Sequence, residues 1–129
     1  MTTTRLRAER CETLADVRRE IDRLDRRIVA LLSERSNYVG EAARIKERAS
    51  QIVDRARIRD VVTKARVRAE ALGADPDTIA RIYEAMIGAF IAFERRAFAA
   101  KAAKATKKNT TKKKATARRR APTRAKASR

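Results

Sequence analysis

The chain has 129 residues and a formal net charge of +18, with one cysteine and no histidine or tryptophan. A disulfide within the chain and catalytic Ser-His or Cys-His pairs are therefore excluded, and we expect neither a metal site nor a cofactor. Plentiful Leu, Ile, Val and Ala with few Gly and Pro favour one all-α domain. No segment has the ~20 apolar residues of a membrane span and the N-terminus lacks an apolar signal core, so we expect a cytoplasmic protein.

The first predicted helix begins at Thr13, after a flexible stretch that we place at residues 1–10. Thr13 and Asp16 have the spacing of a capping box, in which each side chain bonds the other residue's backbone amide. Apolar residues then recur every three or four positions, which predicts a helix to about residue 48. They are Leu14, Val17, Ile21, Leu24, Ile28 and Leu31.

This first helix is too long for a compact monomer of this size. At ~1.5 Å per residue it would extend for roughly 50 Å, and the chain contains no second long helix to cover its apolar face. We therefore expect a homodimer in which two copies of this helix pair.

Two shorter helices should follow a loop at residues 49–54. The second runs from about 55 to 72, and Gly73 is placed to end it. Asp75 and Pro76 are a typical N-cap and first helical residue, and they open a third helix that we expect to end near residue 98.

Most of the positive charge lies after the third predicted helix. Residues 101–129 hold 8 Lys and 5 Arg and no acidic residue, so the preceding hundred residues carry only +5. Without apolar periodicity, this segment is expected to be a disordered tail. Two interpretations stay open, a solvated extension without a ligand and nonspecific contact with nucleic-acid phosphates. A helical protein whose function is nucleic-acid binding through this tail is the alternative to an enzyme.

Charged residues interrupt the apolar faces of the predicted helices. Burial of an unpartnered charge costs several kcal/mol, so these positions need an explanation. One explanation is that the aliphatic parts of the cationic side chains pack against the protein while their charged groups stay in water. Another is that the charged residues set the register between paired helices. Taken together, however, the set indicates an enclosed site for a small multiply anionic ligand, most simply a dicarboxylate, since arginine binds carboxylates bidentately. The residues are Arg18, Arg35, Lys46, Arg57 and Glu94.

The pattern of these residues resembles the all-helical (AroQ-class) chorismate mutase family, which includes the isochorismate pyruvate-lyase branch. The resemblance lies in LADVRREIDRLDRRIVALLSERSNYVGEAARIK, RIRDVV and LGADPDTIARIYEAMIGAFIAFE, within residues 11–98. It implies a chorismate mutase-like helical domain at residues 11–100, forming an intertwined dimer of three-helix protomers with two shared active sites.

The resemblance also implies a role for each charged residue. Arg18 from one subunit and Arg35 from the other would bind the carboxylates of the substrate, and Lys46 would donate to its ether oxygen. Arg57 would be a further binding arginine, and Glu94 would face the same oxygen as Lys46. The expected reaction is the pericyclic rearrangement of chorismate to prephenate, without a cofactor.

The substrate is left open by three positions. Many mutases of the family have a hydroxyl-binding glutamate after the second-helix arginine, where this chain has Ile58, and the lyase branch has an apolar residue there. Asp54 is a second candidate for contact with the hydroxyl side of the substrate. Glu94 stands where many members have glutamine, although some branches, including fungal mutases and aminodeoxychorismate mutases, have glutamate. Isochorismate pyruvate-lyase and aminodeoxychorismate mutase are therefore the alternative activities. We expect Glu94 to act protonated, so that activity falls with rising pH.

Overall fold

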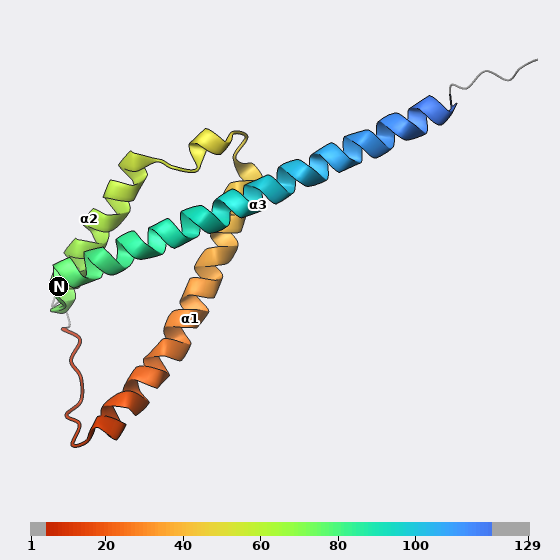
Figure 1. The fold of residues 1–129 in the computed structure, drawn as a ribbon. Coiled ribbons are helices and arrows are strands. Elements are labelled where there is room, and N and C mark those ends of the chain that lie inside the picture. Colours follow the sequence, from red (N-terminus) through yellow and green to blue (C-terminus); the bar gives the residue numbers. More distant parts are fainter. Residues whose placement is uncertain (1–4, 120–129) are drawn as a thin grey trace, which may run out of the picture.

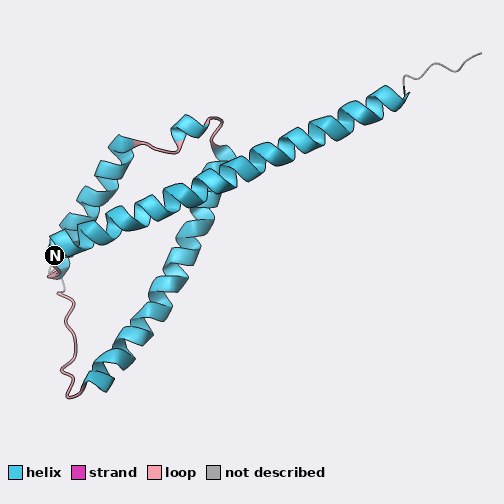
Figure 2. Ribbon diagram, viewed as in Figure 1, coloured by secondary structure: helices cyan, strands magenta, loops and turns pink. Residues whose placement is uncertain are grey.

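The computed structural model describes residues 5–119, and every regular element in that range is helical. The elements are α1 (Leu14–Ile45), the short 3-10 helix η1 (Ala49–Gln51), α2 (Arg55–Leu72) and α3 (Pro76–Arg119) (Figures 1 and 2). The predicted all-α class is confirmed. None of the described helices combines the length and apolar character needed to cross a bilayer.

The start of α1 is fixed by the predicted capping box. The Thr13 hydroxyl accepts from the Asp16 amide at 3.1 Å, and the Asp16 carboxylate accepts from the Thr13 amide at 3.2 Å. The helix ends at Ile45, three residues before the predicted position, because Lys46 turns to an extended backbone (φ −62°, ψ 135°). Lys46 is therefore the first residue beyond the helix rather than part of it.

The α2–α3 hairpin follows its sequence signals closely. Asp54 accepts a hydrogen bond from the Arg57 amide and caps α2, while Asp75 accepts one from the Thr78 amide at the start of α3. Gly73 ends α2 with a left-handed backbone (φ 83°), which glycine adopts without steric cost. The bounds predicted for α2 are confirmed.

The packed core of the described chain is small and rich in alanine. α3 contacts both α2 and the C-terminal part of α1, and the N-terminal part of α1 diverges from the hairpin (Figure 1). Small side chains allow the helix backbones to approach closely. The buried apolar residues are Ala43, Ile52, Ala65, Ala69, Ala80 and Ile87.

The apolar face of α1 is exposed in the described chain. Leu14 keeps 70% of its surface exposed and Leu31 keeps 64%, and Ile21, Leu24 and Ile28 between them are also exposed. A contiguous exposed face of large aliphatic side chains is unusual for a soluble monomer and marks an interaction surface.

The structure corrects the prediction of a disordered segment from residue 101. α3 does not end near residue 98 but continues as one helix to Arg119, and residues 120–129 lie outside the described range. The physical reason is local propensity, since residues 89–121 contain neither Gly nor Pro and are dominated by Ala, Lys and Arg. The absence of apolar periodicity predicted that this segment would not pack, but it did not exclude a helix.

Candidate functional site

Six of the seven predicted site residues line one pocket of about 290 Å³. It lies where the C-terminal part of α1, the loop with η1, the start of α2 and the middle of α3 meet. Its size is close to the lower end of the range for small-molecule sites. Apolar walls come from residues such as Val39, Ile87 and Ile91. The six predicted residues are Arg35, Lys46, Asp54, Arg57, Ile58 and Glu94.

Lys46 and Glu94 form an ion pair inside this pocket. The Lys46 ammonium donates to Glu94 Oε1 at 2.6 Å, with the two side chains 26% and 8% exposed respectively. Among the residues that the structure describes, Glu94 is the only charged residue that is buried. Its burial is tolerable because a buried carboxylate with a close, hydrogen-bonded cation avoids most of the penalty of an unpaired charge.

Arg35 is half-buried and packs against an aromatic ring. Its guanidinium carbon lies 4.7 Å from the centroid of the Phe90 ring on α3, in a cation–π contact. Stacking uses the face of the guanidinium and leaves its edge N–H groups available as donors. Arg35 is therefore packed between α1 and α3 and can still bind a carboxylate through its free N–H groups.

The start of α2 brings a second arginine and an acid to the wall. Arg57 is mostly exposed and its guanidinium donates to Asp60 at 3.1 Å. A hydrogen bond from Lys64, supported by the contact with Arg57, lowers the pKa of Asp60 from its ordinary value. One oxygen of Asp54 accepts from the Arg57 amide at 3.0 Å, so this acid helps to orient the helix that carries the arginine.

Arg18 is the predicted site residue that does not reach this pocket. It is exposed on the N-terminal half of α1, about 25 Å along the helix from Arg35 at 1.5 Å per residue. In the described chain, this pocket therefore contains two of the three predicted arginines.

Gln51 and Phe90 also line the pocket, and sequence reasoning gave neither a role there. Gln51 accepts hydrogen bonds from the amides of Glu47 and Arg48, each at 3.0 Å, and so shapes the loop directly after Lys46. A single glutamine in a short loop has no periodicity that could have marked it. Phe90 was predicted only as a core residue of the third helix.

The pocket has an excess of positive charge. Arg35, Lys46 and Arg57 line it together with the acids Asp54 and Glu94, which leaves one net positive charge from the described residues. With apolar walls and separate cationic groups, the site can bind a small organic anion and orient its carboxylates.

Residues 17–95 match the family model described as chorismate mutase type II. The chain belongs to the chorismate mutase type II family. The match extends from the first turn of α1 to the residue after Glu94, so it includes Arg18 and all the pocket residues named above. It ends before the basic extension of α3. No curated protein sequence matches the chain significantly. The resemblance found in the sequence is thus confirmed as membership of the chorismate mutase type II family.

Proposed function

We propose that the protein is a chorismate mutase that converts chorismate to prephenate. The observation that carries this proposal is the meeting of Arg35, Lys46, Arg57 and Glu94 in one largely apolar pocket, in a chain of the chorismate mutase type II family. These groups suit a reaction in which one C–O bond breaks as one C–C bond forms, without a covalent intermediate or a proton transfer.

The pocket residues would act by orientation and electrostatics. Arg35 and Arg57 bind carboxylate groups and hold the substrate in its compact conformer, which lowers the entropic part of the barrier. The Lys46 ammonium donates to the ether oxygen, where negative charge grows in the transition state. The Glu94 carboxylate holds that ammonium in place through the ion pair at 2.6 Å.

A second copy of the chain would complete each site. The exposed apolar face of α1 supports pairing of two such helices, because association removes large aliphatic side chains from water. In an antiparallel pair, Arg18 of each subunit is carried towards the pocket of the other. This arrangement adds the positive charge that a dicarboxylate requires.

The substrate could instead be isochorismate or 4-amino-4-deoxychorismate. Ile58 favours the lyase alternative, since an apolar side chain lines the pocket next to Arg57 and cannot accept a hydrogen bond from a hydroxyl group. Elimination of pyruvate from isochorismate would use the same charged groups around the breaking ether bond.

Product analysis with each substrate tests the proposal. The purified protein is incubated separately with chorismate, isochorismate and 4-amino-4-deoxychorismate, and the products are identified by mass spectrometry. Prephenate from chorismate is the expected result. If isochorismate gives salicylate and pyruvate while chorismate gives no prephenate, the protein is an isochorismate pyruvate-lyase and the proposed mutase activity is wrong.

Substitution of Lys46 tests the assigned chemistry. We expect Lys46→Ala to lower kcat on chorismate by ~10²–10³, the usual loss when one donor to a developing oxyanion is removed. Lys113→Ala, at an exposed lysine of the α3 extension, is the control and should leave kcat unchanged. Near-normal turnover of Lys46→Ala would show that this pocket does not catalyse the reaction.

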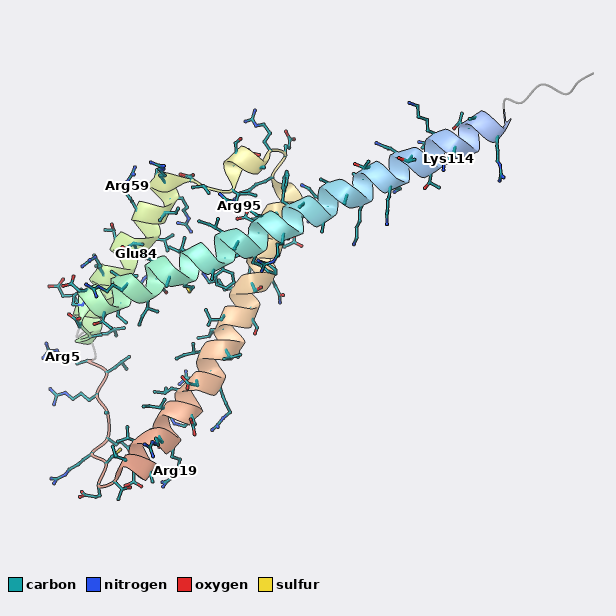
Figure 3. All side chains as sticks on the ribbon, viewed as in Figure 1. Arg5, Arg19, Arg59, Glu84, Arg95 and Lys114 are labelled. Carbon is teal, nitrogen blue, oxygen red and sulfur yellow. The ribbon has the colours of Figure 1, made fainter. Side chains whose placement is uncertain are left out.

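The α3 extension supports a second proposal, nonspecific binding to nucleic-acid phosphates. At about 100° per residue, six cationic residues fall within an arc of about 160° of the helix, which we call the basic face. The opposite side carries Ala, Thr and Asn with one lysine, Lys113. Figure 3 shows Lys114, on the basic face, far from the packed helices. The residues of the basic face are Lys104, Lys107, Lys108, Lys112, Lys114 and Arg118.

The composition of this helix favours nucleic acid over a membrane surface. Helices that lie in a bilayer interface insert Leu, Phe or Trp on the side opposite their cations, and the small polar and alanine side chains here do not provide such a surface. A one-sided row of cations is instead complementary to a row of phosphates.

Salt dependence of DNA binding tests the second proposal. Affinity for a short DNA duplex of arbitrary sequence should fall steeply with salt, and Lys108→Gln should reduce the slope of log Kd against log salt by about 1. Lys113→Gln removes the same charge from the other side of the helix and should leave the slope nearly unchanged. Equal effects of the two changes, or equal binding to anionic vesicles, would contradict a phosphate-binding face.

A further inference from the structure

The side chain of Lys101 connects α3 to the end of α1. Its ammonium donates to three backbone carbonyl oxygens, those of Ala43 at 2.9 Å, Arg44 at 3.2 Å and Lys46 at 2.7 Å. It also lies 4.6 Å from the centroid of the Phe98 ring, and the residue is half-buried. An ammonium has three donor hydrogens, so these contacts use its full hydrogen-bonding capacity.

These contacts stabilise a helix end that is otherwise incompletely bonded. The last carbonyl groups of an α-helix have no amide partner within the helix, and they carry the negative end of the helix dipole. A cation that is bonded to several of them satisfies both the hydrogen bonding and the charge. Lys101 therefore acts as a C-terminal cap for α1 that is supplied by another helix.

Lys46 is consequently held by α3 at two points. Lys101 binds its backbone carbonyl, and Glu94 binds its side-chain ammonium at 2.6 Å. Glu94 and Lys101 are seven residues apart, which is about two helical turns and places both on the same side of α3. Since Lys46 is the first extended residue after α1, these two contacts restrict a position where helix ends ordinarily fray.

We propose that Lys101 is a positioning residue for Lys46, and that α3 must continue past the family match for the site to be fully ordered. The inference rests on the proposed function of Lys46. Lys101 does not line the pocket in the described structure, so its effect reaches the substrate only through Lys46. The matched region ends at residue 95, six residues before Lys101, and the extension of α3 is what brings this side chain to α1.

The first test replaces the ammonium and keeps the apolar stem. Lys101→Met removes all three hydrogen bonds and the contact between the ammonium and the Phe98 ring, and it keeps an unbranched apolar side chain of similar length. A misplaced catalytic group loses transition-state stabilisation more than substrate binding, and shifts of about 1 Å can cost up to 10²-fold in rate. We expect kcat on chorismate to fall roughly tenfold and KM to change less than about twofold. Lys113→Met, on the exposed part of the same helix, should match the wild type in both parameters.

A double-mutant cycle distinguishes positioning from a general structural role. If Lys101 acts through Lys46, adding Lys101→Met to Lys46→Met should lower the residual rate no further, because two residues that serve one function have non-additive effects. Independent, multiplicative losses would overturn the proposal, as would a Lys101→Met enzyme with wild-type kcat. Lys101→Arg keeps a donor at the same place and should recover part of the lost kcat.

Hydrogen exchange separates this inference from the proposed activity. Full-length wild type, Lys101→Met and Lys113→Met are compared by mass spectrometry over a peptide spanning residues 43–48. Faster exchange in Lys101→Met alone is expected, and equal exchange in all three proteins would overturn the positioning role. If the wild type turns over none of the three substrates, the proposed function fails, and this exchange result still decides whether Lys101 orders the Lys46 segment.

Discussion

At the residue scale, three of the charged groups that the sequence placed on apolar helix faces have neighbours that explain their positions: Arg35, Lys46 and Glu94. Arg35 lies on the Phe90 ring, and Lys46 is bonded to Glu94 and, through its carbonyl, to Lys101. The sequence could identify Arg35, Lys46 and Glu94 because periodicity placed them on apolar faces, where their charge was unexpected. It could not pair them with their neighbours, since contacts between residues some fifty positions apart depend on how the helices cross.

At the element scale, helix starts were more predictable than helix ends. The helix starts are capped by Thr13, Asp54 and Asp75, each of which accepts a hydrogen bond from an amide three residues further along the chain. Because these contacts are local, the nearby sequence is enough to find where a helix starts or where the turn before it lies. The end of α1 at Ile45 coincides with contacts from α3 that the local sequence does not contain. The extension of α3 was missed because an argument from apolar burial gave no weight to the helix propensity of Ala, Lys and Arg.

Asp16 should make the start of α1 sensitive to acid. Hydrogen bonds from Thr13 lower the pKa of Asp16 below its ordinary value of 3.8. A carboxyl group whose pKa is lower in the folded state stabilises the fold above its unfolded pKa, and that contribution is lost as pH falls through the lower, folded value. Asp16→Ala should therefore reduce the free energy of unfolding at neutral pH, with a difference from the wild type that shrinks below about pH 4.

Urea unfolding at several pH values, followed by circular dichroism, measures this difference. Asp22→Ala, at an exposed acid of the same helix, is the control and should show a smaller effect at neutral pH. If the free energy of unfolding of Asp16→Ala stays below that of the wild type by the same amount down to strongly acidic pH, the ionisation of Asp16 is not the cause of the difference.

Gly73 tests the turn that joins α2 to α3. Gly73 has a left-handed backbone, which residues with a Cβ rarely adopt. A Cβ added here would also lie 3.1 Å from Arg5 Nε. Gly73→Ala should therefore destabilise the fold by about 1 kcal/mol. Gly88→Ala is the matched control in the interior of α3, where a Cβ meets nothing within 4 Å, and it should stabilise the helix by up to about 1 kcal/mol. The midpoint of thermal unfolding reports both changes, and equal shifts would contradict the turn argument.

At the scale of the whole molecule, a single chain leaves its longest apolar face and one predicted arginine unused. Leu14 to Leu31 stay exposed on α1, and Arg18 is remote from the pocket that holds the other charged groups. A sequence can indicate such a face through its periodicity and length. It contains no separate signal for the position of a second copy, which is why the shared site remains a proposal.

Subunit complementation tests the central claim that Arg18 of one subunit and Lys46 of another serve the same site. Arg18→Ala and Lys46→Ala are each expected to be severely impaired as homodimers. Unfolded together in equal amounts and refolded, they should form about half heterodimers, each with one intact and one doubly altered site, and recover about a quarter of wild-type activity on chorismate. A mixture no more active than the two variants assayed separately would contradict the account.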